Sequence, residues 1–164
     1  MPDLRWEEVR DFFDPELMGS LPDLFVPDTT VDDWQNLLNL VTTSGWTWRY
    51  EQGETELPLP SAKTVLARPT DLATAHLRVW PVSGVLAIFR FTSEHEIDFD
   101  VDLRELQGQE GVDTLCLFLR EIWHGVGKPV LMTNEGGSKE HPVLGYDPVM
   151  DKVTMLAEDS AVNP

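Results

Sequence analysis

The sequence predicts an α+β fold, in which a largely antiparallel, twisted sheet of about six or seven strands packs with two or three helices. Two observations lead to this class. Alternating apolar and polar residues, the pattern of half-buried strands, recur between residues 72 and 103 with only short turns between them. Helical periodicity instead marks the segment after Thr30 and residues 109–124. The 164 residues contain no repeat and no break in composition, so we predict a single domain, residues 1–164.

Residues 1–14 are expected to form an N-terminal helix. Trp6, Val9 and Phe13 would share its apolar face. Pro15 would end it, because the residue before a proline avoids helical geometry.

A second helix is predicted to begin after Thr30, whose side chain can cap it. Asp32 and Asp33 stand in its first turn, where the helix dipole favours negative charge, and Gly45 follows its end. Its apolar stripe consists of Val31, Trp34, Leu38 and Val41.

Between the predicted helices the sequence alternates loops and strands. "GSLPDLFVPD" is predicted to be a loop with a short extended piece, and residues 52–70 a loop with at most a short element near "SAKTVLA". "WTWRYEQ" is predicted to be a strand. A three-stranded meander is predicted at residues 72–80, 85–92 and 95–103.

The third predicted helix, residues 109–124, has a long apolar stripe that consists of Val112, Leu115, Cys116, Leu119 and Trp123. Three short strands are predicted after it, within "PVLM", "PVLGY" and "KVTML". The crossover from residues 95–103 through this helix to "PVLM" would add one right-handed parallel pair. The last residues, 159–164, are predicted to be a flexible tail.

The charge of the chain is strongly negative and unevenly distributed. Twelve basic and 29 acidic residues give a formal net charge of −17. Residues 57–93 carry four bases and one acid, whereas the segments on either side each carry ten more acids than bases. Such a protein repels nucleic-acid phosphates and anionic lipids and attracts basic proteins. We therefore expect a basic protein partner and neither nucleic-acid nor membrane binding, unless the charge serves solubility alone.

Three features of the sequence favour a cytoplasmic location. Cys116 is the single cysteine and cannot form an internal disulfide. The first residues, "MPDLRWEEVR", are acidic and amphipathic and lack the apolar region of a secretion signal. The longest apolar runs fall far short of the roughly 18 residues of a membrane span.

The segment "EHEIDFDVDL", residues 94–103, is the sharpest functional clue. Its even positions are all acidic: Glu94, Glu96, Asp98, Asp100 and Asp102. On a strand these carboxylates share one face at intervals of about 7 Å, and each neighbouring pair repels by roughly 0.6 kcal/mol in water. They cannot be buried without partners, so this face must be wet, paired with bases or covered by a cationic partner.

The apolar residues of the same strand set its expected register. Pairing Phe89 with Phe99 keeps apolar residues together and brings Arg90 beside Glu96. One arginine cannot neutralise five carboxylates. The face is therefore a solvated surface, a docking surface for a basic protein, or a divalent-metal site, and metal is disfavoured because carboxylates in one row diverge.

Other motifs give no support to catalysis. "EIWH" has the Glu-x-x-His spacing of carboxylate-bridged metal sites but has no second copy. "HGVGKPV" stands between a helix and a strand, the wrong order for a phosphate loop, and is interpreted as a helix end and turn. Cys116 is expected to be an inert, buried thiol. We predict no metal, no cofactor and no enzymatic activity.

Aromatic residues offer an alternative site. In "WTWRYEQ", Trp46, Trp48 and Tyr50 would share one strand face. A pocket against the sheet, lined by Trp46, Trp48, His76 and Trp80, would instead make the protein a small-molecule-binding or enzymatic domain.

Several segments together look familiar: "DFFDPELMGSLPDLFV" with "DDWQNLLNLV", then "VDLRELQGQEGVDTLCLFLREIWHGVGKPVLM", and "PVLGYDPVMDKVTML". Their order resembles that of small, strongly acidic cytoplasmic proteins of actinobacteria, most of them uncharacterised. In size and charge the chain is also similar to immunity proteins of bacterial toxin systems. That resemblance implies binding to the active surface of a toxin, and it implies no particular site residues.

The sequence thus predicts a non-enzymatic, cytoplasmic protein that binds a basic protein, as an immunity-type inhibitor binds its toxin. The predicted partner-binding residues are Glu94, Glu96, Asp98, Asp100, Asp102 and Trp80. The central three carboxylates, Glu96, Asp98 and Asp100, are expected to be exposed in the free protein.

Overall fold

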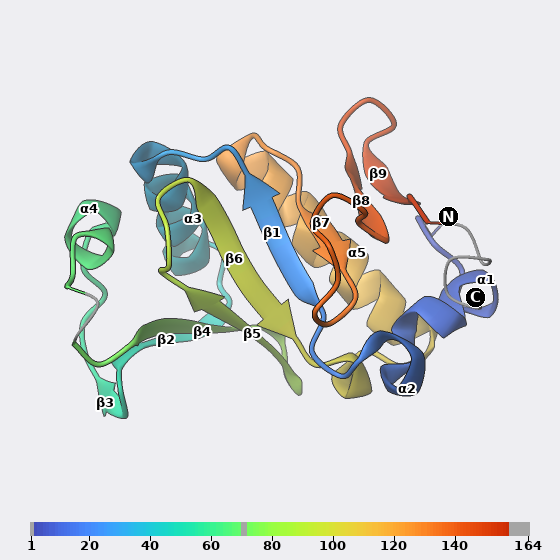
Figure 1. Cartoon of the computed structure of the whole chain (residues 1–164), viewed down its shortest axis with the longest axis horizontal. Helices are drawn as coiled ribbons and strands as arrows, with labels where there is room; N and C mark the ends of the chain where they lie inside the picture. Colours follow the sequence, from blue (N-terminus) through green and yellow to red (C-terminus); the bar gives the residue numbers. More distant parts are fainter. Residues whose placement is uncertain (1, 70–71, 158–164) are drawn as a thin grey trace.

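The computed structural model describes residues 2–69 and 72–157 (Figure 1). In these residues nine strands form one sheet, in the order β3-β2-β4-β5-β6-β1-β7-β8-β9, and all neighbouring strands are antiparallel. The predicted α+β class and antiparallel sheet are confirmed. The predicted numbers of elements were too small, because the described residues form nine strands and five α-helices. The predicted tail, 159–164, lies outside the described residues.

The strands are β1 (Asp23–Pro27), β2 (Thr47–Gln52), β3 (Thr55–Glu56), β4 (Ala75–Val82), β5 (Val85–Arg90), β6 (Glu96–Val101), β7 (Leu131–Thr133), β8 (Leu144–Asp147) and β9 (Lys152–Met155). The α-helices are α1 (Trp6–Val9), α2 (Pro15–Met18), α3 (Val31–Thr43), α4 (Ala62–Leu66) and α5 (Gly108–Val126). The described residues also form two 3-10 turns, η1 (Arg10–Phe13) and η2 (Leu103–Glu105).

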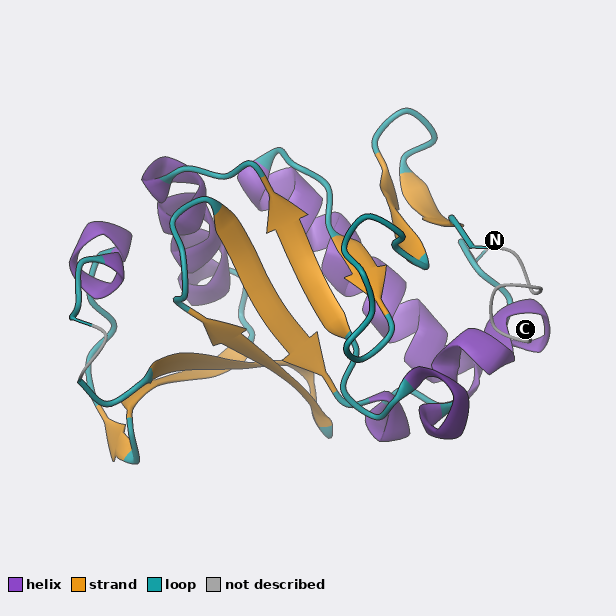
Figure 2. Ribbon diagram, in the orientation of Figure 1, coloured by secondary structure: helices purple, strands orange, loops and turns teal. Residues whose placement is uncertain are grey.

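Helices α3 and α5 cover one face of the sheet, which we call the inner face (Figures 1 and 2). The core between them is rich in aromatic rings. Phe89 of β5 stacks on Phe99 of β6 with ring centroids 4.5 Å apart, and Phe118 of α5 meets both rings edge-on. This confirms the predicted pairing of Phe89 with Phe99. We call the opposite side of the sheet the outer face.

The two long helices begin and end much as their sequences predict. Thr30 and Asp33 form a capping box at the start of α3, in which each side chain accepts a hydrogen bond from the other residue's backbone N–H. Helix α5 ends at Gly127, whose φ of +81° lies in the left-handed region that glycine tolerates.

Strand β1 is the main departure from the predicted fold. It comes from "GSLPDLFVPD", which was expected to be mostly loop, yet it lies in the middle of the sheet between β6 and β7. Leu24 and Val26 are fully buried on its inner side. Because β1 is antiparallel to both neighbours, it also separates β6 from β7, so the expected parallel pair does not form.

The N-terminal segment differs from the single helix predicted over residues 1–14. Helix α1 has only four residues and passes into η1, which buries Phe12 and Phe13. Pro15 does not simply stop a helix. It is the first residue of α2, and Asp14 caps that helix by accepting a hydrogen bond from the N–H of Glu16 at 2.9 Å.

Candidate functional site

The outer face of β6 carries the predicted carboxylates. Its core-facing residues are Ile97, Phe99 and Val101, all buried. The alternating residues, Glu96, Asp98 and Asp100, lie on the outer face and are half-buried rather than exposed as expected. Figure 1 shows this face of β1 and β6 turned toward the viewer, with α3 and α5 behind it. The register adds Asp23 of β1, which lies opposite Asp100. We call six residues the acidic patch: Asp23, Glu94, Glu96, Asp98, Asp100 and Asp102.

Arg90 of β5 is the first internal partner of the acidic patch. The register places it opposite Asp98, two residues from the predicted neighbour Glu96. Its Nη1 lies 2.8 Å from Oδ2 of Asp100, whose side chain is only 13% exposed. Arg90 therefore lies on the acidic face as expected, but its ion pair is with Asp100, and Glu96 is paired with another residue.

Lys139 is a second partner, which the sequence did not reveal. It comes from the connection between β7 and β8, which passes in front of β7 in Figure 1, and its ammonium forms an ion pair with Glu96. The same ammonium lies 5.2 Å from the centre of the Phe25 ring, on the outer side of β1. Desolvation pulls the pKa of Lys139 down, but Glu96, Asp98 and Asp23 together hold it above its usual value.

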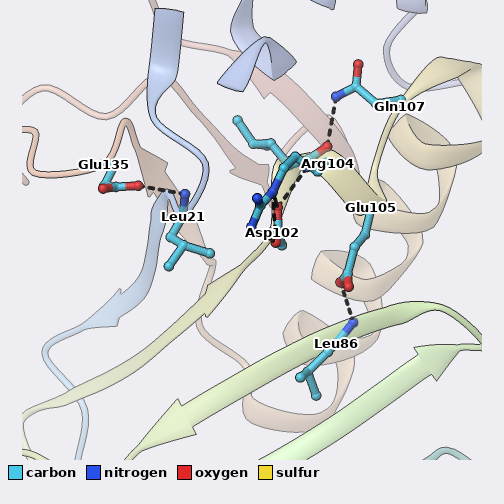
Figure 3. A network of polar contacts seen from close by, with 8 residues as sticks. Leu21, Leu86, Asp102, Arg104, Glu105, Gln107 and Glu135 are labelled. Carbon is cyan, nitrogen blue, oxygen red and sulfur yellow. Dashed lines mark hydrogen bonds and ion pairs between the residues drawn. The ribbon is translucent and has the colours of Figure 1, made fainter. Parts of the chain in front are cut away.

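At the end of β6 the carboxylates serve local structure (Figure 3). Asp102 accepts the backbone N–H of Arg104 at 2.9 Å and also pairs with its guanidinium, which lowers the pKa of the Asp102 carboxyl. Glu105 accepts the backbone N–H of Leu86 at 3.0 Å and so ties η2 to β5. Arg104 stands only two positions after Asp102, so the sequence did hold a signal for this pair.

The half-buried position of the central carboxylates changes their acidity. Desolvation raises the pKa of Asp98, the charges of Glu96 and Asp23 raise it further, and Lys139 opposes them. Desolvation also raises the pKa of Asp100, against the opposing effect of Arg90. Both carboxylates are therefore less stable in their ionised forms than aspartates in water.

The other half of the outer face is basic. Arg78 of β4 donates through Nε to Glu51 of β2 at 2.6 Å, and Arg49 approaches the other oxygen of Glu51 at 3.2 Å. The hydrogen bond from Arg78 lowers the pKa of Glu51 despite its desolvation. Trp80 lies in this half, with the Arg49 guanidinium 5.9 Å from its ring centre. Trp80 is thus on the outer face but among the arginines, away from the acidic patch.

The aromatic pocket considered as an alternative does not assemble. Thr47 pairs with Trp80 and Trp48 with Val79, so Trp46 and Trp48 lie on the inner side of the sheet, whereas Trp80 lies on the outer side. His76 is on the outer side too, opposite Arg90. Trp46 instead lines a groove between α3 and α5.

Two other predicted interpretations can be compared with the structure. Cys116 is buried in α5, and desolvation raises its pKa to about 12, so the thiol stays protonated at neutral pH, as expected of an inert core cysteine. Lys128 of "HGVGKPV" donates to the backbone oxygen of Asp28 and to the Asp33 carboxylate, which agrees with a helix end and turn.

The described residues contain no group of three or more His, Cys, Asp or Glu side chains arranged to hold a metal ion. Over the same part of the chain, none of the helices is both long and apolar enough to cross a membrane. Comparison with known proteins adds nothing further: no protein-family model, no curated protein and no solved structure matches this chain.

Proposed function

We propose that this protein is a non-enzymatic, cytoplasmic binding protein whose acidic patch docks a basic protein, as an immunity-type inhibitor docks its toxin. The observation that carries the proposal is the position of Lys139. Its ammonium contacts Glu96 and lies over Phe25 on the outer face. A lysine of a partner would find the same chemistry in the patch: carboxylates around an aromatic ring.

The acidic patch has more carboxylates than internal cations, which favours the binding of further cations. Its six carboxylates have three ion-pair partners from Lys or Arg, namely Arg90, Arg104 and Lys139. Asp23, Glu94 and Asp98 have no such partner among the described residues. Desolvation, and after it the charges of Glu96 and Asp23, raise the pKa of Asp98, and an added cation would offset those charges.

Arg90 and Lys139 also explain how the fold tolerates a row of carboxylates. They hold Asp100 and Glu96 in place, so these two carboxylates are pre-positioned and lose little freedom when a partner binds. Charge complementarity of this kind mainly accelerates association and selects against anionic competitors.

The test begins with capture. The immobilised protein is incubated with a lysate of its source organism, bound proteins are eluted with salt, and the eluate is identified by mass spectrometry. Association of the captured protein is then measured by stopped flow at low and high ionic strength. Asp23→Asn/Glu94→Gln/Asp98→Asn should slow association about tenfold at low ionic strength and weaken its salt dependence.

A matched variant controls for net charge. Glu7→Gln/Asp11→Asn/Glu16→Gln also removes three carboxylates, all of them exposed, from the N-terminal helical segment and should leave the rate close to that of the wild type. Equal slowing by both variants would show that overall charge, not the patch, attracts the partner. Capture of acidic proteins only would refute the proposal.

A further inference from the structure

A second surface, on the helix side of the molecule, has a different composition. A groove of about 660 Å³ lies between the end of α3, the side of α5 and the end of β4. We call it the α5 groove. Its apolar lining includes Leu40, Trp46, Pro81, Val82, Leu117 and Phe118. The groove faces away from the acidic patch, because α3 and α5 lie on the opposite side of the sheet (Figure 1).

The α5 groove combines a buried aromatic contact with exposed apolar side chains. Phe118 is buried and meets the Trp46 ring edge-on, with centroids 5.1 Å apart. Leu117 of α5 is 57% exposed and Val82 of β4 is 45% exposed, and both line the groove. Large apolar side chains exposed next to a hollow, within one continuous lining, are typical of a protein-binding surface.

The α5 side of the groove has helical spacing. Glu110, Asp113, Leu117 and Glu121 follow one another at intervals of three or four residues along one side of the helix. Glu110 and Glu121 are therefore about 16 Å apart along the axis, the length of about three helical turns. A partner helix lying along α5 would contact all four residues.

The rim of the groove carries one sign of charge. Glu110, Asp113 and Glu121 line it, and none of the described lining residues is basic. Within the described part of the chain these three carboxylates form no ion pair, although Asp113 accepts a hydrogen bond from Gln109 at 2.8 Å. An apolar centre with an acidic rim complements a segment that is apolar on one side and basic at its edges.

The lining of the α5 groove also indicates which kind of molecule would bind there. Sites for small molecules place a few polar groups inside an apolar pocket to orient the ligand. Here the charged groups stand at the rim. The buried polar side-chain atoms that form no hydrogen bond, on Arg49, His76 and Thr133, lie elsewhere. Neither long helix of a second copy suits the groove, because α3 contains no Lys or Arg and α5 presents acids there.

We infer that the α5 groove binds a cationic amphipathic helix of a partner protein, with apolar side chains between Leu117 and Val82 and Lys or Arg side chains at Glu110, Asp113 and Glu121. This surface is separate from the acidic patch, and the inference does not rest on the function proposed for that patch.

The test uses a panel of fluorescently labelled, helix-forming synthetic peptides, each with a leucine stripe flanked by lysines. Anisotropy measures their binding to the full-length protein, and amide chemical shifts locate it. At least one peptide should bind with a dissociation constant of about 10 μM or tighter and shift the amides of residues 110–121. Leu117→Gln should weaken that binding about tenfold, and Glu110→Gln/Asp113→Asn/Glu121→Gln should weaken it several-fold and reduce its salt dependence.

Two controls separate this site from general charge attraction. A scrambled peptide of the same composition has no apolar stripe and should bind at least about tenfold more weakly. The variant Asp23→Asn/Glu94→Gln/Asp98→Asn, which removes three charges from the acidic patch, should bind the peptides like the wild type.

The inference is overturned if no peptide of the panel binds at about 100 μM, if the scrambled peptide binds equally well, or if the acidic-patch variant loses as much affinity as the groove variant. A dimer that forms in ultracentrifugation and is abolished by Leu117→Gln would also overturn it, in favour of self-association. Because Leu117 is largely exposed, the Leu117→Gln variant should fold like the wild type, and circular dichroism verifies this.

Discussion

The outer sheet face and the α5 groove both carry carboxylates, but these carboxylates have different neighbours. On the sheet, Asp100 and Glu96 have cations from β5 and from the β7–β8 connection. At the groove, Glu110 and Asp113 project from a helix into solvent. The sheet carboxylates are held within a crowded surface that removes part of their hydration. The groove carboxylates keep their hydration.

This difference predicts which charges matter for the fold. A half-buried carboxylate depends on its partner, because leaving it unpaired costs its desolvation without compensation. A carboxylate on an exposed helix contributes little in either direction. Substitutions on the sheet should therefore change the free energy of unfolding, whereas substitutions at the groove should change binding alone.

The largest effect is expected from Arg90→Met, which removes the cation between Asp98 and Asp100. Because Arg90 is itself partly exposed, the loss should be about 1–2 kcal/mol in the free energy of unfolding, below that of a fully buried pair. Urea denaturation at neutral pH measures it. The double variant Arg90→Met/Asp100→Asn should recover much of the loss. A double variant as unstable as the single one would show that Arg90 acts through packing rather than charge.

The next effect concerns pH and has opposite signs at two residues of the acidic patch, Asp98 and Asp102. The pKa of Asp98 is raised in the folded state, mainly by desolvation. Between the ordinary aspartate pKa and the raised one, the folded protein thus holds more protons at this group than the unfolded chain, and stability falls as pH rises through this range. Asp98→Asn should remove this fall and stabilise the protein at neutral pH by up to about 1 kcal/mol.

Asp102 provides the contrasting case. Its pKa is lowered, chiefly by the hydrogen bond from Arg104. It contributes stability above the ordinary aspartate pKa and loses this contribution as pH falls through the lowered value. Asp102→Asn should therefore destabilise the protein at neutral pH and flatten the acid limb of the stability profile. Thermal unfolding of both variants across the acidic range checks the two signs, and the same sign for both would contradict the contrast.

The sequence predicted the strands and helices whose patterns are local. The alternation in β6 places every inner residue correctly because a period of two leaves no other arrangement with a buried core. The capping residues of α3 and the apolar stripe of α5 are likewise decided within one segment. These features account for the fold class and for the outer position of the acidic residues.

What the sequence did not predict depends on distant contacts. Strand β1 is short, follows Pro22 and ends at Pro27, so its local pattern is that of a loop. Only pairing with β6 and β7 on both sides makes it a central strand. Lys139 is 43 positions from Glu96 in the chain, and no local pattern links them. The sequence therefore revealed the carboxylates of the candidate site but not which basic residues pair with them.

A smaller effect is expected from Lys139→Met. The Lys139 side chain is 46% exposed, so its ion pair with Glu96 should contribute about 0.5 kcal/mol or less and should weaken further at high salt. Chemical denaturation at low and high ionic strength measures the loss, with Lys63→Met on α4 as a control for the removal of an exposed lysine. A loss as large as that of Arg90→Met would mean that the connection between β7 and β8 depends on Lys139 for its structure.

The smallest effect on stability is expected at the groove. Glu110→Gln/Asp113→Asn/Glu121→Gln removes a favourable charge from the first turn of α5, where Glu110 meets the helix dipole, but it also removes the repulsion between Glu110 and Asp113, three residues apart. These contributions are similar in size and opposite in sign. The free energy of unfolding should therefore stay within about 0.5 kcal/mol of the wild type, as measured by urea denaturation. A loss above about 1 kcal/mol would place these carboxylates with those of the sheet, as charges that the fold itself requires.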